Sequence, residues 1–457
     1  MAYNVLAIAS PIVAATAACV VCMLLTRSTW PSLAGGWLFG FSTYEFAHLI
    51  NDANIFYVGW IPLLVAVFIL RFQLCISKRT FVGLAALLLL LQFGTSIEIL
   101  ATFTLMLGLT GVLAYAFCNG SRAGLLSLGL LVCAAYGIVA LLTLPFELAI
   151  LHGLPQVHPP TSTYVADLAN YIVPTPVTAI GGAWAASVSE RFTGNIAENA
   201  AYLGLPALAI CGSWTVTHWR QGWAQVLFGV WAVAIVLSFG SYIHLLGIPI
   251  TSGPWRLIGQ LPLLSYALPV RFALYASFGA AIMVALWLVG IHRKGKWGPA
   301  LAVLGATATV LSVWPSAGPV PSPWETSLAV PSLFTQRAYA RVIAVGSTIV
   351  TLPYGVNGDS MLWQVDDSLR FRMAGGYVAG FTPLSFLRYR AVAMFYENHP
   401  EPGFVAALDR FVKMKGVDDI VIADTDMRPW AAAMLRLRWS YRRVGGAYVF
   451  SVPRGLR

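Results

Sequence analysis

Residues 41–62 read FSTYEFAHLINDANIFYVGWIP, and this stretch places Glu45, His48 and Asp52 between two long apolar runs. Spacings of three and four residues put these side chains on one face of a helix. Only 10% of the 457 residues are charged. Since ionisable groups within apolar helices are costly, they indicate function by default. The stretch therefore predicts a site where an apolar helix ends.

The composition around this stretch is that of a polytopic membrane protein. Hydrophobic residues make up 58% of the chain, which contains 16 tryptophans, and repeated apolar runs reach the length needed to cross a bilayer. The run 81–93 is the weakest, because thirteen helical residues rise only about 20 Å, whereas the apolar core of a bilayer is about 30 Å thick. About ten spanning helices are expected, at 5–25, 31–50, 55–72, 81–93, 97–118, 123–144, 201–219, 223–241, 270–291 and 297–314.

A second domain is expected from Ser316 to the end of the chain. The hydrophobicity falls there, and helical and strand patterns alternate, which predicts a small α/β domain over 316–457 after a transmembrane domain over 1–315. This tail carries sixteen Arg and Lys against eleven acids. One hypothesis is a lid or acceptor platform for anionic glycans or lipid heads. The alternative is a domain resting on a negatively charged membrane surface.

Basic residues are distributed unevenly between alternate loops. Nine Lys and Arg fall in one set of loops and three in the other, so the first set is expected to be cytoplasmic. Ten crossings then place the C-terminal domain outside the cytoplasm, together with a long loop at 146–200. With the same ten alternating crossings, the first helix begins outside the cytoplasm. An odd number of helices is therefore expected before it.

No motif indicates a metal, a nucleotide or a covalent nucleophile. All six cysteines lie in the apolar part, and the CxxC of Cys19 and Cys22 falls inside a spanning segment without histidines nearby. Zinc motifs, phosphate-binding loops, dinucleotide fingerprints and nucleophile elbows are absent from the sequence. No metal ligands and no nucleic-acid partner are expected, and the cofactor stays unknown.

Several strings follow one another in an order that resembles a known family. They are AYNVLAIAS, AGGWLFGFSTYEFAHLINDANIFYVGWIPLLV, LQFGTSIEILATFTL, VADLANYIVPTP, AENAAYLGLPAL and LPLLSYALPVRFALY. This series resembles bacterial integral membrane glycosyltransferases of the GT-C class, which take sugars from polyprenyl-phosphate carriers. The resemblance spans nearly the whole chain. The chain departs from the family at Asn51-Asp52, where relatives tend to have Gly-His.

The resemblance implies a multi-pass protein of the bacterial inner membrane. In that class an outer loop after the first helix carries the main catalytic acid, whereas this chain resembles the class from the second helix onward, so a first helix and its loop are expected to be missing. The implied partners are a polyprenyl-phosphate-linked sugar, membrane lipids, and a glycan or lipid acceptor of the cell envelope. Donor sugar and acceptor are left open.

Glycosyl transfer from a phosphate carrier needs a carboxylate near the acceptor hydroxyl and cations on the departing phosphate. Asp52 and Glu98 are the catalytic candidates, because each lies at an outer membrane boundary. Asp52 has an alternative role as a solvated turn residue, and Glu98 as an acid in the first turn of a helix. The helices that carry them are expected to bring them together.

Four further residues are candidates for substrate binding. Arg256 and Arg271 could hold the phosphate, since a guanidinium binds two oxygens at once; an interfacial anchor is the alternative for Arg271. His48 could donate to the phosphate or orient Asp52, and packing is its alternative. Glu45 lies deeper, where a structural pair with a basic group of a neighbouring helix is expected.

Three functions compete for this pattern. The first is a GT-C-type glycosyltransferase acting outside the cytoplasm. The second is a flippase or transporter of lipid-linked sugars, for which inverted repeats and acids at mid-depth would be typical; the sequence shows no repeat, and its acids gather towards one side. The third is a shortened relative that folds but does not catalyse. The activity of this chain is therefore left open.

Overall fold

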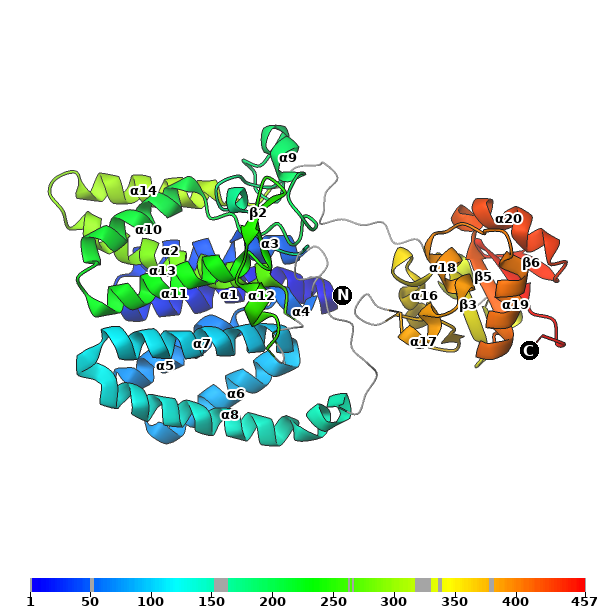
Figure 1. Cartoon of the computed structure of the whole chain (residues 1–457), viewed down its shortest axis with the longest axis horizontal. Helices are drawn as coiled ribbons and strands as arrows, with labels where there is room; N and C mark the ends of the chain where they lie inside the picture. Colours follow the sequence, from blue (N-terminus) through cyan, green and yellow to red (C-terminus); the bar gives the residue numbers. More distant parts are fainter. Residues whose placement is uncertain are drawn as a thin grey trace. The chain divides into compact units, whose positions relative to one another are not determined.

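The computed structural model describes residues 2–49, 53–151, 163–261, 264, 267–316, 330–335, 339–377 and 382–456. The chain divides into two compact units, Met1–Trp324 and Glu325–Arg457 (Figure 1). The first is built from long helices, and the second combines short helices with a five-stranded sheet.

Helices occur at all ten of the apolar segments. Those of the first unit are α1 (Ala2–Thr26), α2 (Thr29–Gly40), α3 (Thr43–His48), α4 (Ala53–Phe56), α5 (Trp60–Phe72), α6 (Lys78–Thr95), α7 (Ile97–Phe117), α8 (Arg122–Leu151), α9 (Ala183–Ser189), α10 (Leu205–His218), α11 (Gly222–Ser238), α12 (Trp255–Ile258), α13 (Ala273–His292) and α14 (Gly298–Ser312).

Six helical stretches of the described residues are long and apolar enough to cross a membrane. They are Tyr3–Thr26, Asn54–Phe72, Lys78–Thr95, Ile97–Phe117, Asn119–Ala149 and Pro269–His292. Four other predicted segments form helices of 12 to 17 residues, so the number of about ten crossings stays a prediction. The segment predicted as 81–93 was too short. The helix has 18 residues, because Ser77 caps it and the polar residues 78–80 form its first turn.

The predicted single helix over 31–50 was wrong, because the helix is interrupted at Phe41-Ser42. Ser42 has an extended backbone, and its hydroxyl accepts a hydrogen bond from the Glu45 N–H, which starts the new helix α3. Upstream, Gly36 and Gly40 lie against α1. A Cβ at Gly40 would be 2.4 Å from the Ala15 nitrogen, so this position needs glycine. The glycine pair therefore allows α2 to pack closely on α1.

Helix α13 is the centre of the first unit. It is surrounded by α1, α2, α10, α11 and α14 (Figure 1), and 83% of its most apolar 18-residue stretch is buried. In contrast, only 11% of the most apolar 18-residue stretch of α8 is buried. The outer face of α8 is apolar and exposed, which suits contact with lipid.

Irregular segments cover one end of these helices. They contain the 3-10 turns η2 (Leu168–Tyr171) and η4 (Pro269–Phe272), and the hairpin of β1 (Tyr242–Leu245) and β2 (Ile248–Ser252). Asp167 connects two of them. Its buried carboxylate accepts hydrogen bonds from the backbone N–H groups of Ala169, Leu246 and Gly247 at 2.8 to 3.0 Å.

The second unit contains a mixed sheet in the order β4-β3-β5-β7-β6. The strands are β3 (Thr348–Leu352), β4 (Arg372–Met373), β5 (Asp419–Ala423), β6 (Tyr441–Val444) and β7 (Ala447–Ser451). Side chains of β5 alternate between two apolar clusters, with Ile420 and Ile422 in one and Val421 and Ala423 in the other. The sheet is therefore covered on both faces.

Short helices supply those covers. They are α15 (Ser332–Thr335), α16 (Ser360–Asp366), α17 (Leu384–Leu387), α18 (Arg390–Tyr396), α19 (Phe404–Lys415) and α20 (Met427–Arg436). Phe404, Leu408 and Phe411 of α19 recur at helical spacing and are buried in the same cluster as Ile420. The alternation of helical and strand patterns that predicted a small α/β domain is present here, for example as α19, β5 and α20 in succession.

Candidate functional site

Arg271 is the centre of a buried group of four ionisable side chains. Its guanidinium donates two hydrogen bonds of 2.8 Å to the two carboxylate oxygens of Glu198. Its Nε donates to Glu98 Oε1 at 3.3 Å, and Nη1 contacts His48 Nε2. We call His48, Glu98, Glu198 and Arg271 the arginine cluster.

The ends of four separate segments supply the arginine cluster. His48 is the last residue of α3, Glu98 lies in the first turn of α7, Arg271 lies in η4 immediately before α13, and Glu198 precedes α10. A carboxylate in the first turn of a helix is stabilised by the exposed N–H groups there. Glu98 is held further by the Leu268 N–H, which donates to Oε1 at 2.8 Å. The cluster thus joins loops that are far apart in sequence.

The two ring nitrogens of His48 have different neighbours. Nδ1 lies 2.7 Å from the Tyr44 carbonyl oxygen and donates to it, since a carbonyl oxygen only accepts. Nε2 contacts Arg271 Nη1 and lies 3.6 Å from Glu198 Oε2. The hydroxyl of Tyr44 is buried beside His48 and has no hydrogen-bond partner among the described residues.

Besides His48, the arginine cluster contains one basic and two acidic side chains. The Glu198 carboxyl is buried, which alone would raise its pKa, but the adjacent Arg271 guanidinium outweighs burial and holds the pKa below its ordinary value. The side chains of Arg271 and Glu198 are 3% and 7% exposed, whereas that of Glu98 is 21% exposed. Glu98 is therefore the carboxylate of the cluster that a ligand can reach. A phosphate approaching Arg271 would have to compete with Glu198.

The structure brings together three of the six predicted site residues. His48, Glu98 and Arg271 come together, while Asp52 lies outside the described residues. Arg256 is apart from the cluster: it is exposed on α12, donates to Ser252 Oγ at 2.9 Å and stacks on the Tyr242 ring.

The prediction that Glu45 pairs with a basic group was wrong. Among the described residues its partner is Ser10, whose hydroxyl also lies 2.8 Å from the Phe56 carbonyl oxygen. Ser10 has a single proton, so it can serve only one of these acceptors. Both contacts are satisfied if Glu45 is protonated and donates to Ser10, which donates to Phe56. Since Glu45 is 0% exposed, the neutral acid is also the form that burial favours.

Sequence reasoning missed Glu198 as a member of the site. The residue was present in the string AENAAYLGLPAL, and it is one of seven acids that precede residue 316. Its segment has no helical or strand period, and nothing in the spacing links it to Arg271. Among the described residues, no group of three or more His, Cys, Asp or Glu side chains could hold a metal ion.

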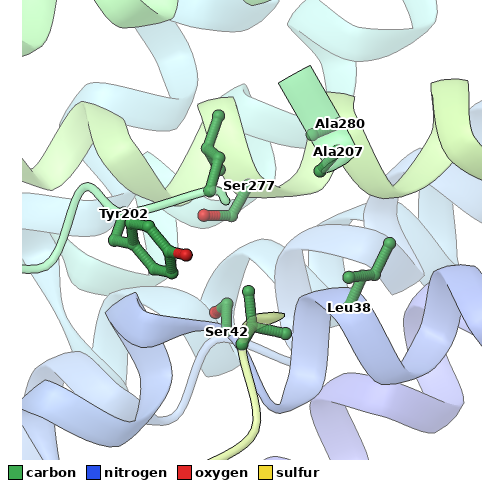
Figure 2. Close-up of a pocket in the computed structure, with 8 residues that line it drawn as sticks. Leu38, Ser42, Tyr202, Ala207, Ser277 and Ala280 are labelled. Carbon is green, nitrogen blue, oxygen red and sulfur yellow. The ribbon is translucent and has the colours of Figure 1, made fainter. Parts of the chain in front are cut away.

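A small cavity of about 10 Å³ lies among α2, α10 and α13, and none of its lining residues belongs to the arginine cluster. Ser42, Tyr202 and Ser277 line it with Leu38, Ala207 and Ala280, and Figure 2 shows the hydroxyl groups of Tyr202 and Ser277 turned toward the same space. The volume suits a single water molecule. Such a water would give a partner to the buried Ser277 hydroxyl, which has none among the described residues.

Comparisons with known proteins show a limited likeness to solved structures. No protein-family model matches the chain, and no curated protein matches it. Among solved structures it is similar to the archaeal oligosaccharyltransferase AglB from Archaeoglobus fulgidus, in complex with an inhibitory peptide and a dolichol-phosphate. The TM-score is 0.46 at 11% sequence identity, covering 99% of this chain and 64% of that one. The chain thus spans less than two thirds of the length of that protein.

Proposed function

We propose that this chain is a membrane glycosyltransferase of the GT-C type, which moves a sugar from a polyprenyl-phosphate carrier to a hydroxyl group of a cell-envelope glycan or lipid. The observation that carries the proposal is the partly exposed carboxylate of Glu98, held 3.3 Å from the Arg271 guanidinium where several apolar helices end. A carboxylate and a guanidinium side by side are the two groups that this transfer requires. The family resemblance of the surrounding strings points to the same reaction.

In the proposed reaction the acceptor oxygen attacks the anomeric carbon of the sugar. Glu98 takes the hydroxyl proton, and the bond between the anomeric carbon and the phosphate oxygen breaks, so that the phosphate leaves with the electron pair. Arg271 stabilises the departing phosphate. Because Glu198 already accepts from both terminal nitrogens of the guanidinium, the phosphate and Glu198 must share these donors. Glu198 is then a positioning residue, which holds the planar fork of Arg271 in place when no phosphate is bound. Asp52 remains a proposed second carboxylate of this site.

The orientation in the membrane is part of the proposal. Nine basic residues occupy the turns at the helix ends opposite the arginine cluster, namely Arg27, Arg71, Lys78, Arg79, Arg122, Arg220, Arg293, Lys294 and Lys296. Two of these turns meet, since Arg27 donates to the Gln73 side chain at 3.2 Å. By the positive-inside rule this end is cytoplasmic. The cluster and the unit Glu325–Arg457 then lie outside the cytoplasm, at the inner membrane of a bacterium.

The test is a transfer assay with the whole chain in phospholipid nanodiscs. Polyprenyl-phosphate-linked hexoses and pentoses, radiolabelled in the sugar, are offered with short envelope glycans and glycolipids as acceptors. The expected result is a labelled acceptor and free polyprenyl phosphate, and the loss of both with Arg271→Ala. Movement of the intact lipid-linked sugar across the bilayer without cleavage would instead support a flippase and overturn the proposal. Full transfer by Arg271→Ala would overturn the proposed site.

A further inference from the structure

A groove in the second unit combines a concave shape with a concentration of positive charge. It measures about 760 Å³ and is lined by residues of α18, α19 and the preceding loops, namely Arg388, Tyr389, Arg390, Gly403, Ala406, Ala407, Arg410 and Met414. This volume is within the range of about 300–1000 Å³ that is usual for small-molecule sites. Three of the eight lining residues are arginines, and none is acidic.

The three arginines differ in how much of their charge is already neutralised. Arg390 forms an ion pair with Glu401 at 3.1 Å. Among the described residues, Arg388 contacts the ring and hydroxyl of Tyr389, with the hydroxyl 3.4 Å from Nη2, and has no acidic partner. Arg410 has no ion pair among the described residues, and all three side chains are exposed. Two guanidinium groups therefore keep an uncompensated charge at the groove.

The remaining lining residues provide a surface of a different kind. Gly403, Ala406 and Ala407 form a floor of small residues along one side of α19, which leaves room for a ring. The ring of Tyr389 is largely buried against Phe411, and Arg388 and Lys415 lie 5.3 and 5.5 Å from its centroid. Small apolar residues next to guanidinium forks suit a ligand that has both a ring and anionic oxygens.

We propose that this groove binds an anionic saccharide, whose sugar ring lies on the alanine floor and whose phosphate or carboxylate is held by Arg388 and Arg410. Guanidinium groups bind the paired oxygens of both anions with the same planar geometry. The proposal concerns binding alone. It does not depend on the arginine cluster or on glycosyl transfer, because a chain that transfers no sugar would still bind this ligand.

The experiment is calorimetric titration of the whole chain in phosphatidylcholine nanodiscs with tetragalacturonate, glucose 1-phosphate and neutral maltotetraose. Both anionic probes should bind and maltotetraose should not. Arg388→Ala with Arg410→Ala should weaken binding about tenfold or more. The control pair, Arg436→Ala with Arg442→Ala, removes the same charge from exposed positions outside the groove and should change affinity less than about twofold.

Three results would overturn the groove as the site. They are no binding of either anionic probe, equal binding of maltotetraose, and equal weakening by the control pair, which would show general attraction to a basic domain. Arg410→Lys keeps the positive charge but loses the planar fork, so it should weaken binding. Because Arg410 is exposed, this variant should leave the domain folded. Repeating the titration in nanodiscs with phosphatidylglycerol separates two sources of the anion, because competition there would identify a lipid head as a ligand of the same groove.

Discussion

Arg271 and Glu198 are joined by two parallel hydrogen bonds of 2.8 Å, across 73 residues of sequence. This pair is almost completely buried, and it fixes the plane of the guanidinium at the ends of several helices. The third nitrogen of the same guanidinium, Nε, then points to Glu98. The buried carboxylate therefore holds the arginine, and the arginine presents a reachable carboxylate beside it.

Glu198→Gln should lower the free energy of unfolding by about 2–3 kcal/mol, because the buried guanidinium loses one of its two charged partners. The effect should depend on pH. Since the Arg271 guanidinium holds the pKa of Glu198 below its ordinary value of 4.5, the pair stabilises the fold fully above that value. The stabilisation is lost as the pH falls through the lowered pKa.

Unfolding in mixed micelles, followed from neutral to acidic pH, measures this dependence. The difference in free energy of unfolding between the natural chain and Glu198→Gln should shrink as the pH falls. Glu190→Gln is the matched control, since Glu190 is an exposed acid of the same segment and its substitution should not change the free energy of unfolding. A difference that stays constant down to the lowest pH would contradict an ionised Glu198.

Glu45→Gln should change both stability and activity little, because the glutamine amide, like a protonated acid, can donate to the Ser10 hydroxyl beside it. Glu45→Ala should cost about 2–3 kcal/mol, since it leaves a cavity and an unpaired hydroxyl. Thermal unfolding of the two variants distinguishes them. A large loss of sugar transfer in Glu45→Gln with an unchanged melting temperature would instead support the substrate-binding role that the sequence predicted.

Asp167→Asn should loosen the β1–β2 hairpin. The aspartate accepts hydrogen bonds from three backbone N–H groups, whereas asparagine has a single acceptor oxygen and would turn its own N–H groups toward donors. Limited proteolysis should cut the turn around Leu246 and Gly247 faster in the variant. Ser187→Ala, on α9 of the same irregular region, is the control; equal cutting rates in all three proteins would refute the role of Asp167.

The orientation predicts which cysteines a membrane-impermeant maleimide can reach in intact cells. In a chain whose other cysteines are replaced, Cys75 lies exposed in the turn between α5 and α6 and should react only after the membrane is opened. Glu190→Cys in the same background should react at once. If Cys75 reacted in sealed cells and the cysteine of Glu190→Cys did not, the chain would have the opposite orientation in the membrane.

The long helices of the first unit were predictable because membrane helices need long apolar runs. Most of their ends were placed to within a few residues, but α8 continues to Leu151, beyond the predicted end at residue 144. Parity of the crossings was enough to bring His48, Glu98 and Arg271 to one end. The break at Phe41-Ser42 was not visible, because a serine that caps a new helix looks like any serine in an apolar run. Its cap depends on local backbone geometry and on the close packing of Gly40 on α1.

Glu198 and the smaller strands could not be predicted for related reasons. The position of Glu198 depends on how an irregular segment folds over the helix ends, for which the sequence has no period. In the second unit β5 was recognisable as a run of buried aliphatic residues. The edge strand β6 has the sequence YRRV with no apolar alternation, and it forms only because β7 pairs with it.

The most direct test of the proposed site is the rate of sugar transfer by Glu98→Gln, compared with Glu190→Gln. The glutamine oxygen can still accept from the Leu268 N–H and from Arg271, so the variant should stay folded and lose less stability than Glu198→Gln. The proposal predicts a loss of about 10²- to 10⁴-fold in kcat for Glu98→Gln, and no loss for the control. Full activity of a normally folded Glu98→Gln would contradict the assignment of Glu98 as the base.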